Sequence, residues 1–140
     1  MRIDDRKFSL VLPKFDNDGH KIKPEILKEF SNKMSEHFGG VTINPSVLGC
    51  WFNSDINKLE CEENIVLFSV RDSETTPNFD EQIKKDREFM EKLSKEAGVK
   101  LGQASVFMME ELVEGDFKEG KRKERLPKNM VGIDFFEKLI

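Results

Sequence analysis

The chain has 140 residues, of which 36% are charged and 37% are hydrophobic, and its net charge is −4 at pH 7. This length suits a single domain, and no apolar run approaches the roughly 20 residues that cross a bilayer, so we expect a cytoplasmic protein with no membrane partner. Seven basic and four acidic residues give residues 118–140 a charge of +3 and leave −7 on residues 1–117. This balance argues against nucleic acid as a partner, because phosphate backbones repel an acidic body.

The first part of the chain predicts a strand, a turn and a helix. Residues 8–12 are apolar and branched, as in a buried strand, and residues 16–19 (Asp-Asn-Asp-Gly) are typical of a turn. A helix is predicted to begin at Pro24 and to end at the glycines of positions 39–40. Its apolar residues recur at helical spacing: Ile26, Leu27, Phe30, Met34 and Phe38.

A hairpin follows. Residues 41–43 and 47–52 read as two pieces of a strand that Pro45 interrupts, and residues 59–70 read as the returning strand. The polar residues 53–58 between them form the predicted loop.

A second helix and a last strand complete the pattern. The helix is predicted to start at residues 77–80 and to stop at Gly98, with its apolar side formed by Phe79, Ile83, Phe89, Met90 and Leu93. Residues 104–109 (Ala-Ser-Val-Phe-Met-Met) are predicted to be the last core strand.

This order, strand–helix–strand–strand–helix–strand, predicts an α+β, ferredoxin-like fold: an antiparallel sheet with two helices on one face. We assign this domain to residues 1–116. Residues 117–140 form a C-terminal extension whose end is strongly apolar, and we expect it to cover the open sheet face of its own domain or to dock on a partner chain.

Two cysteines, Cys50 and Cys61, are the first candidate site. If the hairpin turns at positions 55–56, the two cysteines face each other across the strands. They can then form a reversible disulfide or supply half of a soft-metal site, although neither histidine has a matching ligand spacing. We interpret them as reduced thiols, the usual state in the cytoplasm.

Acidic and aromatic residues of the same hairpin form a second candidate site. Strand alternation places Glu60 and Glu62 on one face and Glu63 on the other, where two adjacent carboxylates can work as acid and base or can simply be solvated. Trp51, the sole tryptophan, is predicted to cap the core, with an aromatic platform on the open face as the alternative.

Other patterns favour structural roles. Asp16, Asp18 and Glu25 occupy three positions of a calcium loop, but Lys14 stands where its first carboxylate belongs, so a plain turn is preferred. His20 and His37 fit no catalytic pattern. The basic run of residues 118–125 reads as a solvated loop, with an RNA contact as the alternative.

Several short motifs, taken together, resemble a small bacterial family of unknown function with Gly-x-Trp and Gly-Gln-x-Ser-Val signatures. The matching residues are Gly40-Val41-Thr42, Gly49-x-Trp51, Glu60, Glu62 and Leu101-Gly102-Gln103-Ala104-Ser105-Val106. The resemblance implies an α+β plan and no established activity. It singles out Thr42, Gly49, Trp51, Glu62, Gln103 and Ser105.

The sequence therefore predicts a self-associating, non-catalytic domain that forms a homo-oligomer and needs no cofactor. The alternative is a small-molecule-binding protein or small enzyme with a pocket between the sheet and the C-terminal tail. In that case the ligand would contact Trp51, Glu60, Glu62, Gln103 and Ser105.

Overall fold

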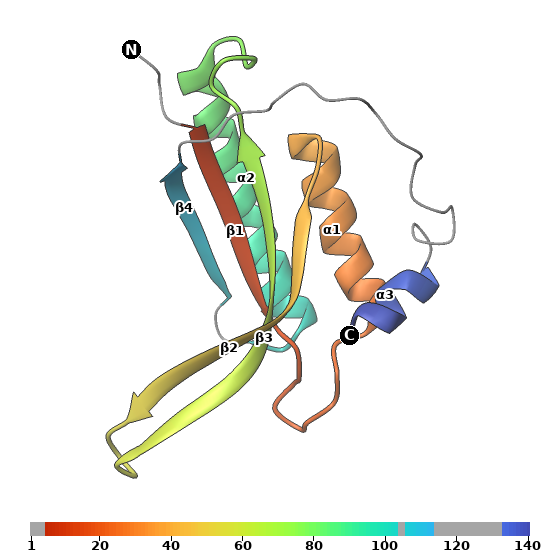
Figure 1. Ribbon diagram of the computed structural model, residues 1–140, viewed down its shortest axis with the longest axis vertical. Helices are drawn as coiled ribbons and strands as arrows, with labels where there is room; N and C mark the ends of the chain where they lie inside the picture. Colours follow the sequence, from red (N-terminus) through yellow and green to blue (C-terminus); the bar gives the residue numbers. More distant parts are fainter. Residues whose placement is uncertain (1–4, 104–105, 114–132) are drawn as a thin grey trace, which may run out of the picture.

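The computed structural model describes residues 5–103, 106–113 and 133–140. Its elements, in chain order, are β1 (Asp5–Pro13), α1 (Pro24–Phe38), β2 (Thr42–Asn53), β3 (Lys58–Arg71), α2 (Phe79–Lys100), β4 (Phe107–Val113) and α3 (Ile133–Leu139). The first six reproduce the predicted order of strands and helices (Figure 1).

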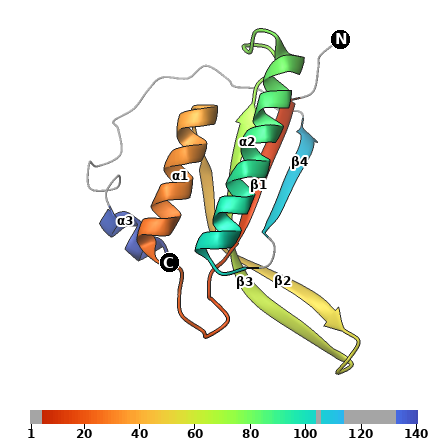
Figure 2. The same cartoon turned by 180° about the vertical axis from the view of Figure 1, so that it is seen from behind.

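The four strands form one antiparallel sheet in the order β2-β3-β1-β4. Helices α1 and α2 lie together on one face of this sheet (Figure 2). The ferredoxin-like fold class is therefore confirmed, because β1 lies between β3 and β4 and β2 pairs with β3, as this fold requires.

Alternation along β1 and β3 builds the core. Leu10 lies opposite Leu67, and Leu12 lies opposite Ile65, and all four side chains are fully buried toward the helices. Helix α1 covers them with Leu27, Phe30 and Met34, which share one helical face and are also fully buried. Each such side chain stabilises the fold by about 1.5–3 kcal/mol through its removal from water.

The predicted end of the second helix is wrong. Gly98 lies buried inside α2, which continues to Lys100. A Cβ at Gly98 would lie 3.4 Å from the backbone oxygen of Gln103, so the connection to β4 packs directly against this position. The glycine serves close packing there rather than a helix stop.

The last strand also differs from its prediction. It occupies Phe107–Val113, later than residues 104–109, and Phe107, Met108 and Met109 are exposed rather than in the core. The reason is its place at the edge of the sheet, where it pairs only with β1. A bidentate ion pair connects this edge to the helix layer. Arg87 of α2 donates from Nε and Nη2 to the two carboxylate oxygens of Glu110 at 2.6 and 2.8 Å.

The C-terminal helix packs on α1, not on the open sheet face. Phe136 is 8% exposed and belongs to the main core cluster, and Lys21 Nζ donates a hydrogen bond of 2.8 Å to the main-chain oxygen of Ile140. Helix α3 thus docks on its own domain, but on α1 rather than on the sheet face where docking was expected, because its apolar side chains join the core cluster. The basic run of residues 118–125 lies outside the described residues.

Candidate interaction surface

The β2–β3 hairpin is longer than the sheet that supports it. Strand β1 pairs with β3 only from Asn64 to Arg71, and the amide of Lys14 donates to the Glu63 carbonyl at 3.1 Å. Beyond Glu63, β2 and β3 pair only with each other within the described structure. We call residues 47–63 the hairpin arm. It projects away from the two helices in both views (Figures 1 and 2).

The predicted register of the arm is confirmed. Cys50 lies directly opposite Cys61, with 4.0 Å between the two Cα atoms. The interpretation of these residues as reduced thiols is corrected, because their sulfur atoms form a disulfide bond. A bonded pair has no thiolate to offer a metal, so the disulfide also removes the support for a soft-metal site.

Trp51 lies on the arm opposite Glu60, and Gly49 lies opposite Glu62. Trp51, Glu60 and Glu62 therefore share one face, and the predicted placement of the two glutamates on one face is confirmed. Trp51 is 46% exposed, so its assignment to the core is wrong. The arm extends past both helices, which leaves nearly half of the Trp51 surface exposed.

The opposite face of the arm is an exposed apolar strip. Leu48, Phe52 and Leu59 are 65%, 61% and 66% exposed, and register places all three on the side that carries the disulfide. Such a cluster of exposed large side chains is typical of an interaction surface.

Strand β2 contains an irregularity before the arm begins. The register of β2 shifts between Asn44 and Val47, around Pro45, which cannot donate a ladder hydrogen bond. At Gly49, a Cβ would lie 3.0 Å from Asn64 Nδ2, and that amide donates to the Glu62 carbonyl at 3.2 Å. Gly49 thus makes room for a cross-strand side chain.

Gln103, another candidate residue of the sequence, does not lie on the hairpin arm with Trp51, Glu60 and Glu62. Its main-chain amide donates to the Gly98 carbonyl at 2.8 Å, and its side-chain amide donates to the Leu101 carbonyl at 3.4 Å. Both bonds stay within the connection after α2, so Gln103 caps that turn. Ser105 lies outside the described residues.

The open face of the sheet is the second part of the candidate surface. Cross-strand pairing places these side chains there, opposite the helices: Val11, Val66, Phe68, Phe107 and Met109. Val66 and Phe68 are half-buried, whereas Phe107 and Met109 are exposed. No element of the described structure covers this face.

Charge on the open face is balanced. Lys7 lies opposite Glu111 across β1 and β4, and its Nζ is 4.2 Å from the centre of the Phe68 ring. The ammonium group thus covers part of the aromatic surface.

A buried polar cluster between α1, β3 and α2 was not predicted. Asp86, which is 0% exposed, accepts hydrogen bonds from Arg71 at both oxygens (2.9 Å each) and from Gln82 Nε2 (2.9 Å). His37 Nε2 lies 2.8 Å from Asp86 Oδ1, and the His37 ring stacks on Phe89 at 3.9 Å. The sole sequence signal was an acidic residue at a position that helical spacing places beside Ile83 and Met90.

The pKa of Asp86 reflects two opposed effects. Burial raises this pKa, but hydrogen bonds from Arg71, Gln82 and His37 together hold it below its ordinary value of 3.8. The carboxylate is therefore ionised and fully engaged by its partners, which fits a structural junction better than a reactive group.

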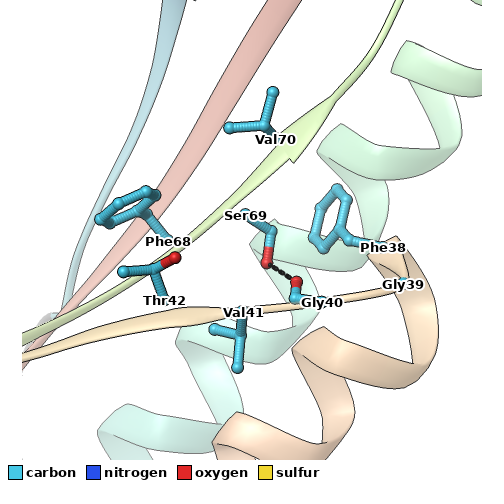
Figure 3. A pocket seen from close by; sticks show the side chains of 8 residues that line it. All are labelled: Phe38, Gly39, Gly40, Val41, Thr42, Phe68, Ser69 and Val70. Carbon is cyan, nitrogen blue, oxygen red and sulfur yellow. Dashed lines mark hydrogen bonds between the residues drawn. The ribbon is translucent and has the colours of Figure 1, made fainter. Parts of the chain in front are cut away.

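A cavity of about 400 Å³ lies where β2 begins (Figure 3). It is lined by Phe38, Gly39, Gly40, Val41, Thr42, Phe68, Ser69 and Val70. Ser69 Oγ donates to the Gly40 carbonyl at 2.6 Å, as Figure 3 shows, which closes one wall. Thr42 is the one candidate residue of the sequence that this cavity contains.

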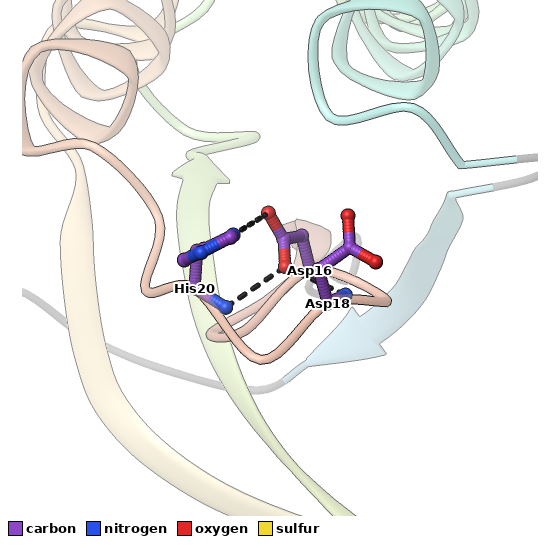
Figure 4. A group of neighbouring side chains, drawn as sticks. All are labelled: Asp16, Asp18 and His20. Atoms are coloured by element: carbon purple, nitrogen blue, oxygen red, sulfur yellow. Dashed lines mark hydrogen bonds and ion pairs between the residues drawn. The ribbon is translucent and has the colours of Figure 1, made fainter.

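The turn at residues 16–20 is confirmed as a turn. Asp16 Oδ1 accepts hydrogen bonds from the main-chain amides of Asp18 (2.9 Å) and His20 (2.8 Å), and Gly19 adopts φ 81° (Figure 4). The Asp16 carboxylate also pairs with His20 Nδ1 at 3.3 Å. These bonds give the acidic group a local structural role.

No family model matches the chain, and no curated protein matches it. The resemblance to the bacterial family therefore stays a prediction. Among the helices that the structure describes, none is long and apolar enough to cross a membrane.

Solved structures do share the fold. A phage SAM lyase in complex with S-methyl-5'-thioadenosine aligns with a TM-score of 0.53 at 13% identity, over 80% of this chain and 84% of that one. CutA1 from Oryza sativa gives a TM-score of 0.47 at 8% identity, over 83% and 85% of the two chains. The GlnK–ATP complex of B. subtilis gives 0.45 at 14% identity, over 79% and 84%. At 13% identity, the likeness to the lyase concerns the fold alone.

Proposed function

We propose that this chain is an assembly module that binds further copies of itself through the open face of its sheet. The observation that carries the proposal is the row of apolar side chains on that face, with Phe107 61% exposed and Met109 38% exposed. A contiguous exposed apolar patch of this kind is often a site of protein–protein contact.

Charge favours a second copy as the occupant. The body of the chain is acidic, and two acidic surfaces repel each other. The open face differs, because its Lys7 and Glu111 lie opposite each other and cancel. Two copies can therefore approach along this face with little repulsion, whereas a strongly charged partner gains nothing from it.

The open face of the sheet is smaller than the area that a stable interface buries on each partner. Four strands spaced about 4.8 Å apart, with roughly five shared residues of about 3.3 Å each, give a planar patch on the order of 300 Å². A stable interface buries about 800 Å² on each partner. The proposed contact therefore extends from the sheet onto neighbouring exposed surface.

Native mass spectrometry of the gently purified chain at micromolar concentration tests this proposal. We expect an oligomer for the unmodified chain and a monomer for the double variant Phe107→Lys/Met109→Lys. The matched control is Val99→Lys, because Val99 is 84% exposed but lies on α2, away from the open face. A monomeric unmodified chain, or a double variant that keeps the oligomer mass, overturns the proposal.

A small-molecule site is the second candidate function. The cavity beside Phe38 and Phe68 supports it, since two aromatic side chains and the Thr42 hydroxyl line a space of about 400 Å³. The fold is also similar to that of a lyase that binds S-methyl-5'-thioadenosine. The same mass spectra distinguish the two functions: a monomer with a reproducible added mass, which Thr42→Val removes, supports a ligand site.

A further inference from the structure

We propose that the Cys50–Cys61 disulfide is a thiol–disulfide exchange site for a dithiol reductant, and that its reduction frees the hairpin arm without unfolding the sheet. Both cysteines are exposed, and they lie on a part of the chain that neither helix covers. This inference does not depend on the proposed self-association.

The arm depends on the disulfide more than the rest of the sheet does. A two-stranded ribbon is marginally stable in water by itself, and the arm is such a ribbon beyond Asn64. Its large side chains, including Leu48, Phe52 and Leu59, are mostly exposed and contribute little burial. The covalent link between the strands is therefore a main constraint on this segment.

The base of the arm is also weakened. The register shift between Asn44 and Val47 interrupts the β2–β3 ladder where the arm leaves the sheet. Below it, β3 is held by β1 through buried pairs such as Leu10–Leu67. Opening of the arm can thus stop at the bulge, while the sheet stays closed.

Reduction of the Cys50–Cys61 disulfide by a dithiol takes two exchange steps. A thiolate of the dithiol attacks the sulfur of one cysteine, the S–S bond breaks, and the other cysteine leaves as a thiolate that takes up a proton. The second thiol of the reductant then attacks the mixed disulfide and releases the first cysteine. Two electrons pass to the protein, and the dithiol becomes its own cyclic disulfide.

Hydrogen exchange with mass spectrometry tests the proposal, with dithiothreitol as the probe. Under native conditions, we expect dithiothreitol followed by iodoacetamide to place two alkyl groups on each chain. Protection of amides in residues 47–63 should fall on the order of 100-fold, while protection in β1 stays unchanged. A disulfide that resists dithiothreitol until denaturant is added overturns the proposal.

The double variant Cys50→Ser/Cys61→Ser is the matched control. It should show the loosened arm without reductant, and dithiothreitol should change nothing further, because the chain has only two cysteines. Equal arm protection in the oxidised and reduced chains contradicts the proposal. So does loss of protection across β1 in the reduced unmodified chain, since the disulfide would then hold the whole fold.

Discussion

Arg71, at the end of β3, forms a bidentate ion pair with the buried carboxylate of Asp86 on α2. Two of its nitrogen atoms each donate to a different carboxylate oxygen at 2.9 Å. The same guanidinium donates to the His37 carbonyl at 3.2 Å, so one side chain joins β3, α2 and the end of α1. Arg71 also lies over the Phe38 ring at 5.1 Å. The helix layer and the sheet are thus connected by charge as well as by apolar packing.

Replacing Asp86 by asparagine should destabilise the fold by about 3 kcal/mol, because it leaves the partly buried Arg71 cation without its counter-charge. Urea denaturation measures this change. The control is Lys84→Ala, which breaks an exposed pair with Glu81 and should cost less than about 0.5 kcal/mol. Equal stability of the Asp86→Asn variant and the unmodified chain would show that the cluster contributes nothing.

Stability should decrease in acid. The folded pKa of Asp86 lies below its ordinary value of 3.8, so its stabilising contribution is complete above pH 3.8 and is lost as the pH falls through the folded pKa. Glu110 adds to this loss, because hydrogen bonds from Arg87 lower its pKa as well. Unfolding free energies measured from pH 7 to pH 3 should fall less steeply for Asp86→Asn than for the unmodified chain. Parallel curves would contradict this assignment.

Gly39 ends α1 in the left-handed conformation, with φ 92°, and its amide donates to the Ser35 carbonyl at 2.8 Å. Gly39→Ala should cost about 1 kcal/mol through backbone strain alone, since no atom lies within 4 Å of the added Cβ. Gly40→Ala is the matched control, with equal space and no positive φ. Thermal unfolding of both variants measures this difference, and we expect a lower midpoint for Gly39→Ala. Identical unfolding midpoints for the two variants would rule out backbone strain at Gly39.

Phe136 anchors α3 to the core. Phe136→Ala should release this helix, because it removes the one buried side chain described for α3. Amides of residues 133–140 would then exchange fast, while those of β1 stay protected. Glu137→Ala, an exposed neighbour, should leave the exchange of α3 unchanged. Continued protection of α3 in the Phe136 variant would mean that other contacts hold it.

Local patterns carried much of the fold. Alternation in β1, helical spacing in α1 and the glycine stop at position 39 are set by neighbours in the chain, so they can be predicted from the sequence. The pairing of Cys50 with Cys61 was also predictable, because the short loop between two strands determines their register. The oxidation state of the pair was not, since it depends on the reduction potential of the pair relative to that of its surroundings.

Tertiary structure decided what each predicted element faces. Trp51 and Met109 have apolar side chains like those of the core, yet one lies on an arm beyond the helices and the other on an edge strand. The Arg71–Asp86 contact joins residues 15 positions apart, and His37 enters from 49 positions away. The sequence by itself determined the elements and their order, because these depend on local periodicity. Which faces are buried depends on the length of each element relative to its neighbours, and the folded chain alone decides that.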